Sequence, residues 1–146
     1  TQNLKVTKSI AIAGKTGTPK FPCSINLDAA AIKDFTIVLS NEIGEELLIG
    51  YDAKQNQYFI DRTKSGKIDF QNNFAARHVA PRLTDNAAMK ISLVIDVSSV
   101  ELFADDGFTV MTTIFFPNKP YNQIRILSTD GILIKKLEYL RLKSIW

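Results

Sequence analysis

The stretch of sequence that decides the fold is Ser99–Phe116, which reads SVELFADDGFTVMTTIFF. Two β-rich runs flank Asp106-Gly107, and an Asp-Gly pair in that position is typical of a β-hairpin with a two-residue turn. We therefore predict a positive φ at Gly107, and we interpret Asp105 and Asp106 as turn formers rather than ligands. The expected opposed pairs are Asp105 with Phe108, Phe103 with Val110, Leu102 with Met111, and Glu101 with Thr112.

Alternation along the two strands gives this hairpin two apolar faces. A strand pair that is apolar on both sides should be covered on both sides. Glu101 is the exception, and a carboxylate among apolar neighbours should be paired, face a ligand or lie at the edge of a domain interface. One face carries Val100, Leu102 and Met111, and the other carries Phe103, Phe108, Val110 and Ile114 together with Glu101.

Similar short runs recur along the chain and predict further strands. Asp34–Ser40 places Phe35, Ile37 and Leu39 on one face, and Met89–Val97 does the same with Ile91, Leu93, Ile95 and Val97. Glu46–Asp52 and Tyr58–Arg62 are predicted to pair, as are Tyr121–Ser128 and the segment from Ile132 onward, with Asp130-Gly131 at the turn. This spacing predicts an all-β sandwich or barrel.

Two segments are compatible with more than one structure. Asp28–Lys33 contains three consecutive alanines and could form a short helical turn. In the last segment, Leu133, Leu137 and Leu140 have helical spacing, but alternation there also allows a strand. We prefer the strand, because the preceding Asp-Gly turn would set up a hairpin.

Composition excludes several classes of function. The 146 residues, 45% of them hydrophobic, suit one globular domain over residues 1–146, and no apolar run approaches the ~20 residues of a transmembrane helix. The net charge of +3 is spread along the chain except near its end, so a nucleic-acid surface is not indicated. Lys135, Lys136, Arg141 and Lys143 form that terminal exception.

The cysteine and histidine counts limit the chemistry further. Cys23 is the only cysteine and His78 the only histidine, so neither an internal disulfide nor a Cys/His zinc site can form, and no cofactor or metal is indicated. We interpret Cys23 as a small buried hydrophobe and His78, beside Arg77, as a residue of a polar loop. Trp146 and Tyr139 could stack on a sugar, but packing at the edge of the core is the simpler role.

The hairpin resembles that of a known family. Residues 98–103 (SSVELF), 106–107 (DG) and 114–117 (IFFP) are similar to the C-terminal domain of glycoside hydrolase family 32, the levanases, inulinases and invertases. That domain typically has Asp-Arg-Ser-Ser-Val-Glu-Val-Phe, an Asn-Asp-Gly-type turn and a strand ending in Phe-Pro. Val97 departs from it by replacing the arginine. Further similarity lies in Tyr58–Gly66, in Phe70, Phe74, Arg77, His78 and Pro81, and in Leu142–Trp146.

The resemblance implies a fold and a parent protein. The fold would be a two-sheet antiparallel β-sandwich of jelly-roll or concanavalin-like form, as the C-terminal part of a two-domain enzyme. Its partner would be an N-terminal five-bladed propeller that carries the two catalytic carboxylates needed to hydrolyse β-fructosidic bonds. The family's Trp-Met-Asn-Asp-Pro-Asn-Gly, Arg-Asp-Pro and Glu-Cys stretches are absent from this chain, so the resemblance implies no catalysis by the chain alone. It also implies a secreted, periplasmic or cell-surface bacterial parent.

Three hypotheses about the function remain open, two of them implied by the resemblance. The leading hypothesis is a non-catalytic accessory domain that stabilises the propeller. The alternative is a carbohydrate-binding module for the terminal fructose of levan or inulin, and the second alternative is an unrelated lectin-like domain. Charged side chains that grip neighbouring hydroxyls would serve a fructose site. The candidates are Asp61, Arg62, Asp96 and Glu101, whose structural alternative is mutual pairing or turn capping.

Overall fold

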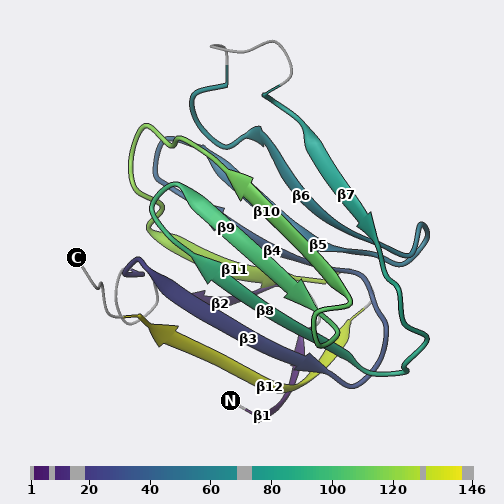
Figure 1. Cartoon of the computed structure of the whole chain (residues 1–146). Coiled ribbons are helices and arrows are strands. Elements are labelled where there is room, and N and C mark those ends of the chain that lie inside the picture. The colour runs from purple at the N-terminus through teal and green to yellow at the C-terminus, as the bar shows by residue number, and fades with distance from the viewer. Residues whose placement is uncertain (1, 7–8, 14–18, 69–73, 129–130, 143–146) are drawn as a thin grey trace.

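Antiparallel strands make up the computed structural model, which describes residues 2–6, 9–13, 19–68, 74–128 and 131–142. Those residues form twelve strands in two six-stranded sheets, shown in Figure 1, and they contain no helix. In this part of the chain, accordingly, no helix is long and apolar enough to cross a membrane.

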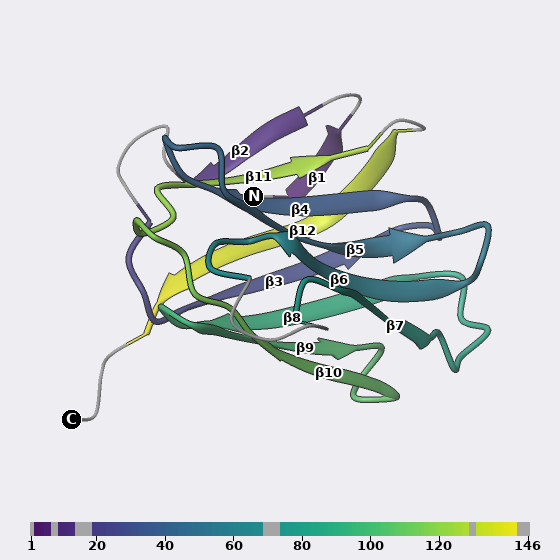
Figure 2. The ribbon, with the colours of Figure 1, turned by 90° about the horizontal axis from the view of Figure 1, so that it is seen from above.

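The two sheets lie face to face, and Figure 2 shows them as two layers. Sheet A has the order β1 (Gln2–Val6), β12 (Ile132–Arg141), β3 (Cys23–Ala29), β8 (Met89–Ile95), β9 (Ser99–Ala104) and β10 (Thr109–Ile114). Sheet B has the order β2 (Ser9–Ala13), β11 (Gln123–Leu127), β4 (Phe35–Ser40), β5 (Glu46–Asp52), β6 (Gln57–Lys64) and β7 (Arg77–Pro81). The predicted two-sheet antiparallel β-sandwich is confirmed.

The core fills the space between the sheets. Alternate residues of β4, β8, β9 and β10 point inward, and burying one leucine or isoleucine side chain stabilises the fold by about 1.5–3 kcal/mol. The faces predicted for β4 and β8 are confirmed, with the exception of Val97. That residue follows the end of β8 and is exposed, because the chain has already turned toward β9. The inward residues predicted correctly are Phe35, Ile37, Leu39, Ile91, Leu93 and Ile95.

The strands β9 and β10 have the predicted register, although Asp105 and Phe108, predicted as a further opposed pair, lie in the turn beyond the last pair of the ladder. Phe103 faces Val110, Leu102 faces Met111 and Glu101 faces Thr112. Asp106 and Gly107 have φ of 59° and 90°, and the Phe108 amide donates to the Asp105 carbonyl at 3.3 Å. A positive φ at both central residues is typical of the primed hairpin turns, and Asp105 has φ of 55° as well, so three successive turn residues are left-handed.

The predicted pairing of β11 with β12 is wrong. Both segments are strands, but β11 lies between β2 and β4 in sheet B, whereas β12 lies between β1 and β3 in sheet A. Both edges of each strand are therefore occupied by other partners, and the connection through Gly131 passes from one sheet to the other. The preference for a strand over a helix after Ile132 is confirmed, although the hairpin that suggested it does not form.

Two local predictions also need correction. No helical turn forms in Asp28–Lys33, because β3 continues to Ala29 and the chain then leaves the sheet without regular structure. His78 and Arg77 do not lie in a loop but on β7, the edge strand of sheet B. This strand is largely exposed, so it lacks the apolar alternation by which a strand is found in a sequence.

Candidate functional site: the outer face of sheet A

The four residues predicted to bind sugar do not form one site. Asp61 lies on β6 on the outer side of sheet B, whereas Glu101 lies on β9 on the outer side of sheet A, so the whole sandwich separates them. Among the described residues, no hydrogen bond or ion pair joins any two of the four. Contact of any one of them with sugar remains an untested prediction.

Arg62 is used within the fold. Its Nε donates to the carbonyl of Phe74 at 2.6 Å, and one terminal nitrogen donates to the carbonyl of Ile114 at 3.1 Å. The guanidinium also lies 3.7 Å from the centre of the Phe74 ring, and burial lowers its pKa. Because Ile114 ends β10, Arg62 joins the two sheets at the side of the sandwich where β7 and β10 approach each other.

The three predicted carboxylates differ in their surroundings. Asp61 accepts hydrogen bonds from the amide and hydroxyl of Thr63 at 2.9 and 2.6 Å, and Asp96 accepts one from the Val97 amide at 2.7 Å. The Asp61 bonds therefore lie within β6, where its register with β5 is irregular, and the Asp96 bond lies in the β8–β9 turn. Glu101 is exposed, beside Val94 and Thr112 on the neighbouring strands.

The two apolar faces of the hairpin are not equivalent. Val100, Leu102 and Met111 point into the core and are buried. The expectation that the other face is covered does not hold in this chain. Its side chains remain exposed by 37% at Phe103, 61% at Phe108, 54% at Val110 and 49% at Ile114. We call these four residues the hairpin face; Glu101 and Thr112 lie on the same side between Val110 and Ile114. Exposed apolar side chains gathered on one strand pair make this face a candidate interaction surface.

A buried ion pair anchors the turn of the hairpin. Arg82 Nε lies 3.2 Å from Asp105 Oδ2, and the two side chains are 4% and 3% exposed. Tyr58 donates its hydroxyl proton to the same oxygen at 2.6 Å, and burial followed by this bond raises the tyrosine pKa far above its usual range. The terminal nitrogens of Arg82 also donate hydrogen bonds, Nη1 to the carbonyl of Thr84 and Nη2 to the carbonyls of Asn86 and Ala88.

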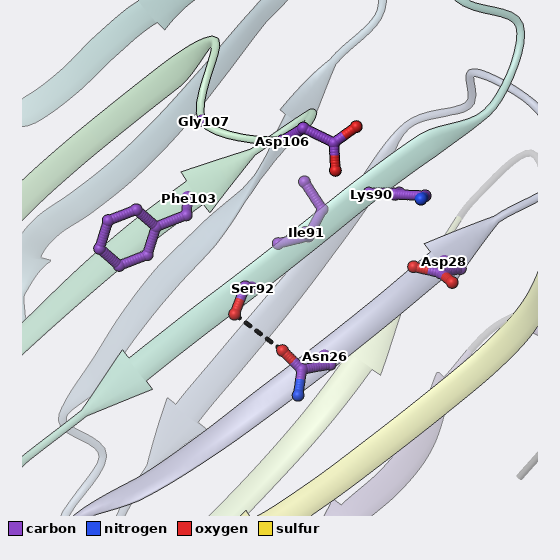
Figure 3. A pocket seen from close by; sticks show the side chains of 8 residues that line it. All are labelled: Asn26, Asp28, Lys90, Ile91, Ser92, Phe103, Asp106 and Gly107. Carbon is purple, nitrogen blue, oxygen red and sulfur yellow. Dashed lines mark hydrogen bonds between the residues drawn. The ribbon is translucent and has the colours of Figure 1, made fainter.

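A hollow of about 480 Å³ opens on the outer face of sheet A. Figure 3 shows its lining, which comes from β3, β8, β9 and the hairpin turn. Ser92 donates its hydroxyl proton to Asn26 Oδ1 at 2.7 Å, and Asn26 Nδ2 donates to Glu138 Oε1 at 3.1 Å. A second hollow of about 350 Å³ shares Lys90 and Asp106 with the first.

Other candidate groups are structural. Cys23 is fully buried, as predicted, and burial raises the pKa of its thiol to about 11, which opposes formation of a nucleophilic thiolate. Tyr139 packs against the core and bonds the backbone of Lys20, as predicted, whereas Trp146 lies outside the described residues. The described part of the chain has no group of three or more metal-ligating side chains.

Sequence reasoning found the hairpin but missed both the Arg82–Asp105 pair and the hollow. Asp105 was assigned correctly to the turn, with φ of 55°, yet nothing local to it indicates a partner twenty-three residues away. Asn26, Ser92 and Phe103 meet only because β3, β8 and β9 are neighbours in sheet A. The polar residues Lys90 and Ser92 at outward positions of β8 were the available signal.

Comparison with known proteins agrees with the hairpin motif. The family described as glycosyl hydrolases family 32 C terminal matches residues 1–144. The chain belongs to this family. It is 40% identical over 100 residues to an extracellular exo-inulinase of Aspergillus ficuum, covering 66% of this chain and 19% of that protein. It is 32% identical over 117 residues to a levanase of Bacillus sp. (strain L7), covering 80% of this chain and 13% of that protein.

Solved structures of the family have the same fold. The exo-inulinase of Aspergillus awamori superposes with a TM-score of 0.78 at 29% identity, over 99% of this family 32 domain and 30% of that chain. Sucrose-6-phosphate hydrolase of Lactobacillus gasseri has a TM-score of 0.71 at 24% identity, over 99% and 28%, which shows the fold alone. The chain therefore spans less than a third of each of these relatives.

Proposed function

We propose that this chain is a non-catalytic accessory domain of a secreted fructan hydrolase, and that its hairpin face packs against the catalytic domain of the same polypeptide. The observation that carries this proposal is the exposure of Phe103, Phe108, Val110 and Ile114. Removing such side chains from water is favourable by roughly 25 cal/mol per Å² of apolar surface. Val100, Leu102 and Met111, on the inner face of the same hairpin, are already buried in this way against sheet B.

The length of the relatives supports an occupant from the same polypeptide. They are named exo-inulinase and levanase, and the sequence matched here is 19% and 13% of their length. Most of such a protein thus lies outside the matched region, which is consistent with a further domain that could cover the hairpin. The name of the Aspergillus relative includes the word extracellular, which supports secretion of the parent.

Two isoleucines allow a controlled test in the parent protein. Ile114 on the hairpin face and Ile43 in the β4–β5 turn are both 49% exposed in this chain. Ile114→Lys should lower the melting temperature of the parent and its rate of fructose release from inulin or levan, because a charge is buried at the domain contact. Ile43→Lys should leave both unchanged. Equal effects of the two substitutions would refute docking through the hairpin face.

The absence of catalysis has its own test. The purified 146-residue chain should release no fructose from levan, inulin or sucrose, since a retaining mechanism needs a nucleophile and an acid/base about 5–5.5 Å apart, on opposite sides of the bond. The family's motifs for those groups do not occur in the sequence. Sustained release by a pure sample would overturn the accessory role.

A further inference from the structure

We propose that the edge of sheet A opposite the hairpin binds a membrane surface that contains anionic lipids. The proposal does not depend on docking of the hairpin face. Sheet A has β1 and β12 at one edge and β9 and β10 at the other, with β3 and β8 between them, as Figure 1 shows. The two edges are therefore separate surfaces, and both can be occupied at once.

The charges of the chain are unevenly distributed along the sequence. Residues 1–20 contain four lysines and no acidic residue, and residues 131–146 contain four basic residues and one acidic residue. With eight basic residues and one acidic residue, these two ends carry a formal charge of +7, whereas residues 21–130, with ten basic and fourteen acidic residues, carry −4. Such a charge asymmetry is typical of a surface that attracts an anionic partner.

Strand pairing brings the two basic ends of the sequence together. β1 pairs with β12, and Lys5 is opposite Leu133. Near the other end of β12, the backbone amide of Lys20 donates to the Tyr139 hydroxyl at 3.0 Å. Basic residues that are more than a hundred positions apart in the sequence are therefore gathered along a single strand.

The described basic side chains of this edge are exposed, and none of them takes part in an ion pair with another described residue. They are Lys20, Lys135, Lys136 and Arg141. Asp28 is opposite Lys136 on β3 but is not paired with it. Glu138, the acidic residue of β12, accepts a hydrogen bond from the neutral amide of Asn26 at 3.1 Å. The positive charge of this edge is therefore left for a partner.

Two exposed leucines lie among these cations. Leu133 and Leu140, near the two ends of β12, are 43% and 46% exposed. We call these leucines and the four basic residues the β12 surface. Cations attract anionic headgroups, and apolar side chains enter the boundary between headgroups and acyl chains, so a lipid surface uses both kinds of residue. A soluble polyanion would use the cations alone and leave the leucines in water.

The experiment is co-sedimentation of the 146-residue chain with phosphatidylcholine vesicles that contain or lack phosphatidylglycerol. We expect binding only to vesicles with the anionic lipid, and release as NaCl is raised from about 0.05 to 0.5 M. Lys135→Gln/Lys136→Gln should lower the partition constant about thirtyfold. The matched control is Lys54→Gln/Lys64→Gln, which lowers the net charge equally at two exposed positions in sheet B. It should change the partition constant by less than about threefold.

Two further comparisons identify the partner and the surface. Leu133→Ala/Leu140→Ala should weaken vesicle binding about tenfold, because less apolar surface enters the lipid. Polygalacturonate, a soluble acidic polysaccharide, should bind more weakly than the anionic vesicles at equal concentration of charge. Ile114→Lys on the hairpin face should not weaken vesicle binding. All the substituted side chains are exposed, and if a variant fails to fold, the lipid and salt dependence of the unchanged chain still test the proposal.

Four results would overturn the proposal. The first is equal binding to vesicles that lack phosphatidylglycerol. The second is an equal loss of binding in the two lysine pairs, which would show that net charge and not the β12 surface controls it. The third is binding that Ile114→Lys abolishes and Lys135→Gln/Lys136→Gln does not, which would place the lipid on the hairpin face. The fourth is tighter binding of polygalacturonate with no effect of the leucine substitutions, which would make a soluble polyanion the partner.

Discussion

Two turns at different places in the sandwich are each held by a carboxylate, and they differ in how far it is removed from water. In the β9–β10 turn, Asp105 is buried with Arg82 and Tyr58. In the β4–β5 turn, Glu45 accepts hydrogen bonds from the amide and side chain of Asn118 at 2.7 and 2.5 Å. The buried carboxylate of Asp105 forms an ion pair with a single arginine, whereas the carboxylate of Glu45 accepts hydrogen bonds from neutral amide groups near the surface.

The difference teaches where a sequence change matters. Removing one member of a buried ion pair leaves the other charge uncompensated, which costs more than the pair itself contributes. A carboxylate near the surface can take water in place of a lost donor. The β9–β10 turn should therefore be sensitive to single substitutions. The β4–β5 turn should respond mainly to acid.

Asp105→Asn should give the largest loss of stability, about 3–5 kcal/mol, because it removes the charge opposite Arg82 while keeping the size of the side chain. Urea unfolding of the 146-residue chain measures this loss. Asp106→Asn in the same turn is the matched control. It is exposed, and we expect a change within about 0.5 kcal/mol. Equal losses of unfolding free energy in Asp105→Asn and Asp106→Asn would show that burial of the carboxylate does not determine the effect.

Gly107→Val should cost roughly 1–3 kcal/mol, the penalty for a β-branched residue in a sparsely populated backbone region. Gly107 has φ of 90° and Gly44 of the β4–β5 turn has φ of 84°, and an added Cβ would meet nothing within 4 Å at either position. Gly44→Val should therefore lower the melting temperature by a similar amount. An unchanged melting temperature for Gly107→Val would mean that the turn does not require a positive φ at this position.

Acid should affect the β4–β5 turn by a smaller amount. Burial on its own raises the pKa of Glu45, but the bonds from Asn41 and Asn118 outweigh it, and the pKa lies below its usual value. The stabilisation is thus present above the unfolded-state pKa of about 4.3 and is lost as pH falls through the lower folded-state value. In Glu45→Gln, the free energy of unfolding should therefore fall less between neutral and acid pH than in the original chain, by about 0.5–1 kcal/mol. If the free energy of unfolding depends on pH equally in both proteins, Glu45 does not cause the acid sensitivity.

Patterns within a few residues of one another predicted the local structure well. The alternation of Phe35, Ile37 and Leu39 identified an inward face, and Asp106-Gly107 fixed both a turn and a register. The alternation of side chains along a strand assigns each residue to a face of the sheet, but it does not determine which strand lies next to it. The partners of β11 and β12 depend instead on which strands already occupy each sheet, so their pairing was predicted wrongly.

The candidate site was harder to predict for the same physical reason. Asp61 and Glu101 both lie in segments that resemble the family, yet they end on opposite sides of the sandwich. Asn26, by contrast, lies in a stretch with no distinctive motif, and its bond to Ser92 spans sixty-six residues. The family motif located the hairpin and left open what covers its outer face.

Hydrogen exchange is the most direct test of docking by the hairpin face. Amide exchange should be compared between the 146-residue chain and the parent protein that includes the catalytic domain, in peptides covering residues 108–116 and 41–46. β10 is an edge strand, so a covering domain should shield its free amides. We predict slower exchange in the parent for 108–116 and equal exchange for 41–46. Equal exchange in both segments would contradict the docking of this face.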